Sequence, residues 1–456
     1  MAGRYKAYPE YKSTDEVWLG NVPSHWRDLK INRLTIVKRG ASPRPIDDPK
    51  YFDEAGEYSW VRIADVTASD TYLENTPQRL SPLGASLSVK LEPNELFLSI
   101  AGTVGKPCIN KIKACIHDGF VYFPEYKENT KFLFYIFAAG EAYKGLGKFG
   151  TQLNLNTETV GGIKIGIPCI EEQHKIVNFL DHETAKIDTL IAKQEKLIEL
   201  LKEKRQAVIS HAVTKGLNPQ APMKDSGVEW LGEVPEHWGV MRLKHLIKFL
   251  ESGCSVNAAD IPAKEDEIGV LKTSCVYTRR FRAGENKTVV MEDLFRVKCP
   301  VRKGAIIISR MNTPELVGAS ALVDTEASNL FLPDRLWQTI FNDQFEVNPE
   351  FLAHFMTVEG FRNQISLSAE GASSSMQNIA KEDYLAINAL LPQPKEQAEI
   401  VSYIKENEAK FLRLEAQAVN AIELMKERKT ALISAAVTGK IDVRHFVTEQ
   451  GQPQGV

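Results

Sequence analysis

Two long stretches of the chain carry apolar residues at steps of three and four, the period of one face of an α-helix. They cover residues 170–214 and 395–437, and neither contains Pro or Gly. Both are rich in strong helix formers, so each is predicted to form one uninterrupted helix. At 1.5 Å per residue, about 43 residues make a rod of roughly 64 Å. A helix of that length needs a partner along its apolar face.

The two apolar faces match when the second stretch is shifted by 224 residues. We therefore predict that they meet in one seam, as in a coiled coil. Within one chain the simplest geometry is an antiparallel pair with a domain entering each end. The predicted seam positions are Ile176, Leu180, Ile187, Leu190, Leu197, Leu201, Val208 and Ala212 in the first helix, and Ile400, Ile404, Phe411, Leu414, Ala421, Met425, Leu432 and Ala436 in the second.

Other phrases also occur twice. WLGNVPSHW at 18–26 returns as WLGEVPEHW at 230–238, which predicts a packed aromatic clasp before each domain. The helix starts EEQHKIVNFL and KEQAEIVSYI also match, as do the helix ends KRQAVISHAVTKG and RKTALISAAVTGK. The chain is therefore an internal repeat with a period far longer than that of a solenoid.

The segments between the clasps and the helices have the composition of short strands. In the first domain these are residues 58–63, 95–100, 119–123 and 163–168, with one predicted helix at 130–144. Residues 268–273, 304–309, 335–341 and 386–392 repeat the same order. The loops between them are long and differ in sequence, and binding groups usually lie on such loops.

These patterns predict an α+β fold with two loop-rich mixed domains, two long antiparallel coiled-coil helices and a pseudo-two-fold internal repeat. The predicted boundaries are 1–168 for the first domain, 169–214 for the first long helix, 215–227 for a linker, 228–393 for the second domain, 394–438 for the second long helix, and 439–456 for a polar tail expected to be disordered.

Composition narrows the functional class only slightly. The chain has 456 residues, is 43% hydrophobic and 25% charged, and carries a net charge of −3, so a nucleic-acid interface requires its basic residues to be grouped. No apolar run approaches the eighteen or so residues of a membrane span. The six cysteines form no C-x-x-C pair, and we expect reduced, mostly buried thiols in a cytoplasmic protein.

Catalytic signatures are missing. GTVGKP at 102–107 lacks the spacing and the hydroxyl residue of a phosphate-binding loop. Asn348-Pro349-Glu350-Phe351 nearly matches the Asn-Pro-Pro-Phe signature of amino-methyltransferases, but no Gly-rich nucleotide loop accompanies it. We instead predict that Asn348 caps a helix whose first turn contains Pro349.

The repeated phrases, in this order, resemble the specificity subunits of type I restriction-modification systems over essentially the whole chain. The resemblance implies a non-catalytic subunit whose two target recognition domains each read one half of a split double-stranded DNA site, while the helix pair fixes the gap. It implies two methyltransferase subunits docked on the helices and motor-endonuclease subunits added to that core. S-adenosylmethionine, ATP and Mg would then belong to the partners, with no cofactor on this chain.

Candidate DNA contacts are cationic and amide side chains on the loops, because cations bind phosphates and Arg, Asn or Gln can read base edges. A basic patch with aromatic neighbours at 277–282 belongs to this set. The predicted residues are Arg62, Lys106, Lys148, Gln152 and Asn154 in the first domain, and Lys272, Arg279, Arg280, Arg282, Arg310, Asn312, Gln377 and Asn378 in the second.

Two other hypotheses remain at this stage. One is a structural coiled-coil adaptor, which would lack the steep salt dependence that phosphate contacts impose on DNA binding. The other is a DNA enzyme with an unrecognised site, which would transfer methyl groups from S-adenosylmethionine without a partner.

Overall fold

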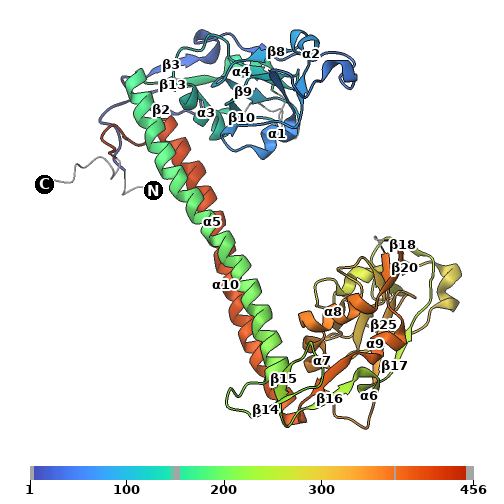
Figure 1. The fold of residues 1–456 in the computed structure, drawn as a ribbon. Helices are drawn as coiled ribbons and strands as arrows, with labels where there is room; N and C mark the ends of the chain where they lie inside the picture. Colours follow the sequence, from blue (N-terminus) through green and yellow to red (C-terminus); the bar gives the residue numbers. More distant parts are fainter. Residues whose placement is uncertain (1–4, 145, 147–154, 374–375, 448–456) are drawn as a thin grey trace. The chain divides into compact units, whose positions relative to one another are not determined.

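The computed structural model describes residues 5–144, 146, 155–373 and 376–447. The chain divides into two compact units (Figure 1). Unit 1 comprises Met1–Glu195 with Val419–Val456, and unit 2 comprises Lys196–Ala418. Each unit therefore contains one mixed domain together with a part of each long helix.

The domain of unit 1 is built on two sheets. The first has the strand order β4-β12-β9-β10-β6 and the second has the order β7-β5-β11-β8. The strands are β4 (Lys38–Arg39), β12 (Phe120–Tyr122), β9 (Leu96–Ser99), β10 (Pro107–Asn110) and β6 (Tyr72–Leu73), then β7 (Arg79–Leu80), β5 (Tyr58–Val61), β11 (Ala114–Ile116) and β8 (Val89–Leu91). The helices are α1 (Ile63–Ala68), α2 (Pro82–Ser86), α3 (Thr130–Ala138) and α4 (Thr157–Gly162), with the 3₁₀ turns η1 (Ile31–Arg33), η2 (Pro49–Tyr51) and η3 (Glu141–Tyr143).

The domain of unit 2 repeats this plan. Its sheets have the orders β17-β25-β21-β23 and β18-β20-β19-β24, and a third has the order β22-β27-β26. The strands are β17 (Ile247–Ser252), β25 (Leu336–Phe341), β21 (Ile306–Ser309), β23 (Ser320–Leu322), β18 (Ala258–Ala259), β20 (Asn286–Val289), β19 (Gly269–Leu271), β24 (Leu330–Phe331), β22 (Met311–Asn312), β27 (Met376–Asn378) and β26 (Glu370–Ser373). The helices are α6 (Leu243–Leu246), α7 (Pro349–Phe355), α8 (Glu359–Ser368) and α9 (Lys381–Ala386), with η4 (Thr273–Val276) and η5 (Met291–Arg296).

The pairing of the strands confirms the internal repeat. In unit 1, β12 pairs antiparallel with β4 and β9, as β25 does with β17 and β21 in unit 2. The strands within the predicted 58–63 and 268–273 segments also match, because β5 and β19 each form a parallel pair, with β11 and β24 respectively. The short ladders match too, with β13 (Lys164–Ile167) on β3 (Arg27–Lys30) and β28 (Asn388–Leu391) on β16 (Gly239–Arg242).

The helix predicted at 130–144 is shorter than expected. Its N-cap Asn129 accepts hydrogen bonds from the backbone N–H groups of Lys131 and Phe132, and α3 ends at Ala138. The reason is Gly140, whose φ of +72° is left-handed and stops the helix before η3. The cap predicted at Asn348 is confirmed, since its side chain accepts from Glu350 N and Phe351 N and Pro349 occupies the first turn of α7.

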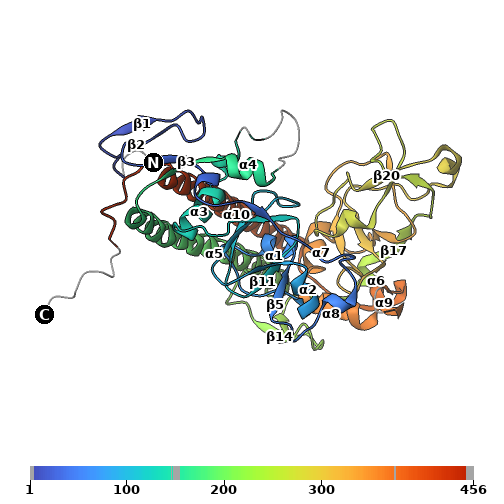
Figure 2. The same ribbon diagram turned by 90° about the horizontal axis from the view of Figure 1, so that it is seen from above.

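The long helices are α5 (Ile170–Lys215) and α10 (Pro394–Val437). They run antiparallel within each unit, as in Figures 1 and 2, where the start of α5 lies beside the end of α10 in unit 1. There Lys429 Nζ lies 2.7 Å from Asp188 Oδ1, and in unit 2 Arg205 lies 4.0 Å from Glu415. The observed ends differ by at most one residue from the predicted 169–214 and 394–438, and the start of α10 at Pro394 is as predicted.

The predicted seam is wrong in phase near the middle of the helices. Leu190, Leu197 and Leu414 are 48%, 41% and 46% exposed. In α5 the covered positions after Ile187 are Ile191, Gln194, Ile198 and Leu201, which alternate steps of four and three. In α10 they include Glu415, Ala418 and Ile422.

The prediction assigned leucines to the seam even where the helical period places a polar residue there. The observed seam contains polar residues, such as Arg205 and Glu415, which pair across it. The other predicted positions are covered to different degrees. Ile176, Leu180, Ile187, Ala212, Ile400, Ile404, Leu432 and Ala436 are buried, and Leu201, Val208, Phe411, Ala421 and Met425 are half-buried.

Each aromatic clasp is part of a hydrophobic core. Trp26 and Trp238 are 0% and 1% exposed. The Glu-Gln pair that is repeated near the start of each long helix has a structural role. Gln173 accepts a hydrogen bond from Asn129 N at 3.0 Å, and Gln397 accepts one from Asn348 N at 2.7 Å. Each glutamine therefore ties the start of a long helix to the N-cap of the short helix, α3 or α7, that packs beside it.

Two of the predicted boundaries need correction. The linker 215–227 contains β14 (Met223–Asp225), which pairs with β15 (Glu233–Pro235) as β1 (Tyr11–Ser13) pairs with β2 (Asn21–Pro23). The tail predicted at 439–456 is not disordered up to residue 447, because Ile441 and Val443 are buried and Asp442 N donates to Lys6 O. Residues 448–456 lie outside the described residues.

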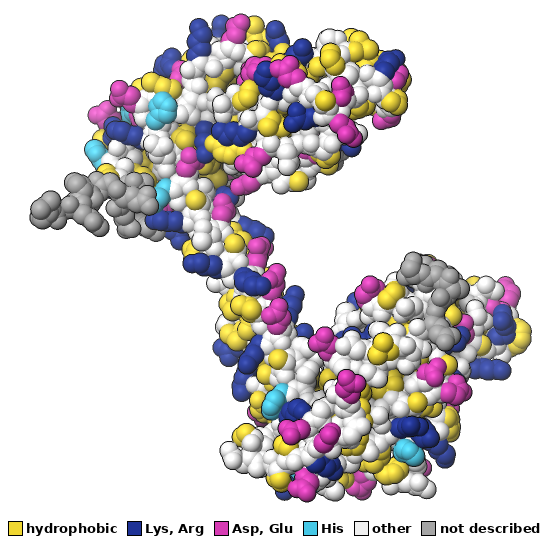
Figure 3. All heavy atoms as spheres, viewed as in Figure 1, with side chains coloured by type: hydrophobic (Ala, Val, Ile, Leu, Met, Phe, Trp, Pro, Cys, Tyr) yellow, Lys and Arg dark blue, Asp and Glu magenta, His cyan; other side chains and the backbone are white. Residues whose placement is uncertain are grey.

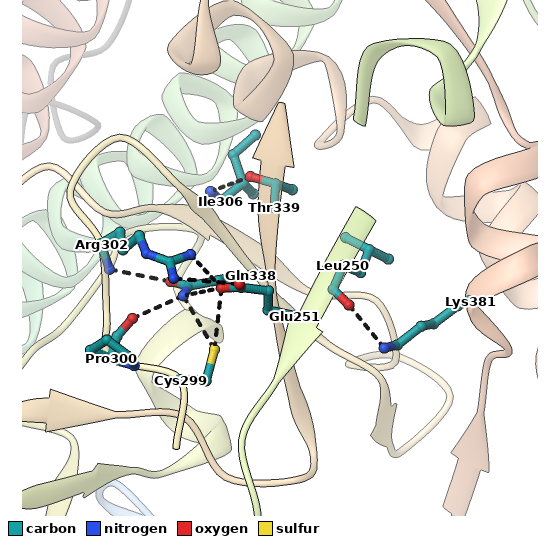
Figure 4. Close-up of polar contacts among 9 residues, drawn as sticks. All are labelled: Leu250, Glu251, Cys299, Pro300, Arg302, Ile306, Gln338, Thr339 and Lys381. Atoms are coloured by element: carbon teal, nitrogen blue, oxygen red, sulfur yellow. Dashed lines mark hydrogen bonds and ion pairs between the residues drawn. The ribbon is translucent and has the colours of Figure 1, made fainter. Parts of the chain in front are cut away.

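A partly buried polar network joins two strands of the main sheet of unit 2 (Figure 4). Gln338 on β25 is 0% exposed, and its Nε2 donates to Pro300 O at 2.9 Å and to Glu251 Oε2 on β17 at 3.2 Å. Glu251 also pairs with Arg302, whose backbone N–H donates to Gln338 Oε1. Because these groups satisfy one another, the network has a structural role in joining β17 to β25.

Candidate nucleic-acid interface

Two predicted residues of the first domain lie around α1. Arg62 is the N-cap residue of α1, is exposed, and donates to Gln78 Oε1. Lys106, at the end of the loop between β9 and β10, donates from Nζ to Thr67 O of α1 at 2.7 Å. The hydroxyls of Thr67 and Thr103 are 2.7 Å apart and join the same loop to α1. The fold thus brings the two cations to one helix, with Arg62 the more open of the two.

A cavity beside Arg62 contains residues that were not predicted. It has a volume of about 670 Å³ and is lined by Arg44, Trp60 and Asp118, among others. Arg44 is 81% exposed and its Nη2 lies 3.3 Å from Asp118 Oδ2. Two guanidinium groups and a carboxylate at one opening supply both donors and acceptors for base edges. The basic sequence KRGASPRP at 38–45 is the feature from which Arg44 could have been predicted.

The remaining predicted residues of the first domain are Lys148, Gln152 and Asn154. All three lie outside the described residues, so their prediction stays untested.

In the second domain, Lys272 occupies the position that Arg62 has in the first. Each is the N-cap residue of the helical turn that follows the matching strand, β5 or β19. Lys272 pairs with Asp260 at 2.8 Å. Next along the chain, Arg280 is exposed and lies 3.6 Å from Glu408, and Arg282 lies 3.4 Å from Glu285. These ion pairs are at the surface, where they contribute little and can be exchanged for phosphate.

Four of the remaining predicted residues of this domain, Arg310, Asn312, Gln377 and Asn378, lie in or directly beside the small sheet of β22 and β27. Met311 pairs with Asn378 and Asn312 with Gln377. Arg310 O accepts from Ile379 N, and Arg310 Nε donates to Asp334 O at 2.8 Å. The prediction therefore grouped residues that the fold does bring together, from segments about 65 residues apart.

Within this group the roles differ. Asn312 is 8% exposed, and its Nδ2 donates to Tyr277 Oη at 2.8 Å while its Oδ1 accepts from Thr313 N. Its amide is therefore occupied inside the protein and supports the loop that carries Arg279–Arg282. In contrast, Gln377 Oε1 and Asn378 Oδ1 are buried and lack a hydrogen-bond partner among the described residues.

Two partly buried arginines stand out in the same domain. Nη1 of Arg279 and Nη1 of Arg362 on α8 are both buried without a hydrogen-bond partner in the described part of the chain. Burial, and next the nearby Arg279, lower the pKa of Arg362 to about 10. Arg279 also has a left-handed φ of +61°. Since a buried cation without a counter-ion is costly, this pair is suited to an anion. Arg362 was not predicted, because it lies within a helical pattern.

The described residues were also compared with what metal binding, thiol chemistry and membrane insertion require. Within residues 5–144, 146, 155–373 and 376–447, no group of three or more His, Cys, Asp or Glu side chains could hold a metal ion. All six cysteines are free thiols, and burial raises the pKa of Cys115 and Cys299 to about 11. Among the described residues, no helix is both long and apolar enough to cross a membrane.

Sequence comparison finds one family model and several curated relatives. Residues 23–200 match the type I restriction modification DNA specificity domain. The chain is 24% identical over 214 residues to the EcoEI specificity subunit of Escherichia coli, covering 46% of this chain and 35% of that protein. It is 26% identical over 304 residues to the EcoKI specificity subunit of Escherichia coli strain K12, covering 63% and 60%. These two alignments therefore span less than two thirds of the relatives' own lengths.

Two further matches extend over nearly the whole chain. The StySPI specificity subunit of Salmonella potsdam is 21% identical over 441 residues, covering 92% of this chain and 90% of that protein. A chain from a solved structure concerning complex assembly and conformational transition of the type I R-M system matches with a TM-score of 0.65 at 14% identity, covering 92% and 99%. At that identity the structural match demonstrates a shared fold.

Proposed function

Because the chain belongs to the family of type I restriction-modification specificity subunits, we propose that each of its two domains reads one half of a bipartite double-stranded DNA site. The subunit is non-catalytic. Methyl transfer and cleavage, with their S-adenosylmethionine, ATP and Mg, belong to the methyltransferase and motor-endonuclease partners.

The observation that carries this proposal is the repeated strand pairing combined with unlike loops. The same scaffold places Arg62 and Lys272 at matching N-cap positions. Around them the residues differ, with Arg44 and Asp118 in the first domain and Arg280 and Gln377 in the second. Because different donor and acceptor sets select different bases, the two half-sites differ and the whole site is asymmetric.

The cations divide between positioning and reading. Phosphate contacts fix a protein on the duplex without carrying sequence information. Arg280 and Arg282 are exposed and form surface ion pairs with Glu408 and Glu285, so they suit phosphates. Nη1 of Arg279 and Arg362 and the amide oxygens of Gln377 and Asn378 are buried and have no hydrogen-bond partner among the described residues, so they suit groups that enter the domain more deeply.

The surface of the helix pair is proposed to hold the methyltransferase subunits. Leucines that the seam leaves uncovered are between 39% and 56% exposed, namely Leu190, Leu197, Leu200, Leu412, Leu414 and Leu424. Figure 3 shows hydrophobic side chains at the surface of the helices among Lys, Arg, Asp and Glu. Repeated exposed leucines on a charged helix are typical of a protein-binding surface.

The helix pair is also proposed to fix the spacer between the half-sites. Deleting one heptad from both α5 and α10 shortens each by about 10.5 Å, which corresponds to about 3 base pairs at 3.4 Å each. The spacer preferred by the assembled complex, measured by sequencing methylated DNA from a library with spacers of every length, should shrink by that amount. A library control with scrambled half-sites should remain unmethylated. An unchanged spacer would contradict the proposal.

A further inference from the structure

One aromatic residue of α10 in unit 2 is much more exposed than its repeat counterpart on α5 in unit 1. Tyr403 on α10 occupies the position of Phe179 on α5, 224 residues earlier. Phe179 is 0% exposed and Tyr403 is 40% exposed. Because both belong to matching helix starts, the difference arises from what covers each ring.

In unit 1 the cover consists of two aromatic side chains of the same chain. The ring of Tyr5 lies 5.3 Å from that of Phe179 at 85°, and the ring of Phe446 lies 5.0 Å from it at 83°. Phe446 also contacts His182 at 5.2 Å. These edge-to-face contacts come from the segment before β1 and the segment after α10. The site in unit 1 is therefore built to accept an aromatic ring.

In unit 2 a single segment replaces these two. After α5 the chain turns at Gly216, with φ of +76°, and leads directly to β14. This segment places Leu217 in the same cavity lining as Tyr403. Between Gly216 and β14 it contains no aromatic residue that could take the place of Phe446. A cavity of about 450 Å³ remains, with a mainly apolar wall that includes Ala207, Val208, Leu217 and Tyr403.

The lining of this cavity includes one cation, Lys204. Lys204 and His211 line it, and neither has an ion-pair partner among the residues that the structure describes. The nearby Arg205 is already paired with Glu415. An apolar pocket with an uncompensated amine at its edge favours an apolar side chain that has a carboxylate beside it.

We propose that this cavity is a socket for an aromatic side chain, flanked by an acidic residue, on the methyltransferase subunit. The inference rests on the proposed function, in which methyltransferase subunits bind the helix pair, and it names where one of them is anchored. Buried aromatic anchors in such pockets commonly dominate the binding energy of an interface. Since the matching site of unit 1 is filled by Phe446, the two methyltransferase sites on the helices are not equivalent.

The test fills the socket. Ala207 is exposed and lines the cavity, so Ala207→Phe should occupy it without entering the core. The matched control is Ala431→Phe, the same position in the repeat, which is exposed and lies in unit 1. Full-length variants are mixed with a co-expressed and purified methyltransferase subunit, and stoichiometry and affinity are measured by native mass spectrometry and calorimetry. Circular dichroism confirms that both variants are folded.

Ala207→Phe should weaken one of the two binding events at least tenfold, while Ala431→Phe leaves both unchanged. Replacement of Tyr403 by p-benzoylphenylalanine should give a photo-crosslink to a methyltransferase peptide that has an aromatic residue next to Asp or Glu. If the unaltered chain binds methyltransferase and Ala207→Phe binds it equally well, the socket is refuted and the proposed function stands. If the unaltered chain binds none, both are refuted.

Discussion

Replacing Glu172 by alanine should destabilise unit 1 far more than the matching change destabilises unit 2. Glu172 is 4% exposed and accepts hydrogen bonds from Tyr8 Oη at 2.7 Å and from Trp26 Nε1 at 3.1 Å. His25 Nε2 lies 2.8 Å from its other oxygen. Alanine leaves the tyrosine and tryptophan donors buried without an acceptor, at a cost of about 1–3 kcal/mol each.

The half-exposed His25 contact adds little, so the expected loss is about 2–6 kcal/mol. For a unit of this size each kcal/mol lowers Tm by about 2–4 °C, and a loss of about 3 kcal/mol therefore gives about 6–12 °C. Differential scanning calorimetry of the full chain should show one transition displaced by this amount. Near-UV circular dichroism should report the loss of the ordered Trp26 environment in the same transition.

The repeat supplies the control. Glu396 is the counterpart of Glu172, but within the described residues its side chain hydrogen-bonds to His237 alone, at 2.8 Å, and Trp238 Nε1 is buried without a partner there. Glu396→Ala should therefore cost less than about 1 kcal/mol. Glu172→Gln, which keeps an acceptor, should fall between the two. Equal displacements for Glu172→Ala and Glu396→Ala would refute the assignment of the stability to these buried hydrogen bonds.

Three further predictions address the seam, the second domain and pH. Ile187→Ala should lower the free energy of unfolding, measured by urea denaturation, by about 2–5 kcal/mol because it opens a cavity. Leu190→Glu should change that free energy by less than about 0.5 kcal/mol and instead weaken methyltransferase binding. A larger loss for Leu190→Glu than for Ile187→Ala would show that Leu190 does face the partner helix. Arg280→Ala should lower the slope of log K against log salt for DNA by about 1, and Asn312→Ala should lower stability by about 1–3 kcal/mol; a DNA defect in Asn312→Ala without a stability change would assign its amide to base reading. Burial lowers the pKa of His354 below 6.5, so the unfolded chain binds the proton first and stability should fall as pH drops below about 6.5, by up to about 1.4 kcal/mol per unit; a His354→Gln variant with the same pH slope would contradict this.

The sequence allowed the repeated scaffold to be predicted because its signals are local. Strand composition at 58–63 and 268–273, and the uninterrupted helical pattern after Ile170, depend on neighbours within a few residues. In contrast, the set of residues that faces the partner helix does not depend on near neighbours in the sequence. Whether Leu190 or Ile191 faces the partner helix depends on contacts with residues more than 200 positions away, such as the contact of Asp188 with Lys429.

The candidate interface was harder to predict from the sequence for the same reason. Arg62 and Lys272 could be found because they follow strands directly. Whether Asn312 is free or occupied depends on Tyr277, which reaches it from another loop. Arg362 belongs to the site only through tertiary packing around Arg279, and no spacing in its helix reveals that.

The charged pairs between α5 and α10 restrict sliding of one helix along the other. A slip of one helical turn displaces Lys429 by about 5.4 Å, which breaks its 2.7 Å contact with Asp188. Arg205 and Glu415 impose the same restriction in unit 2. A purely leucine interface would tolerate several alignments, whereas these pairs make one alignment preferable in each unit. The length of the helix pair should therefore tolerate only those insertions or deletions that place opposite charges next to each other again.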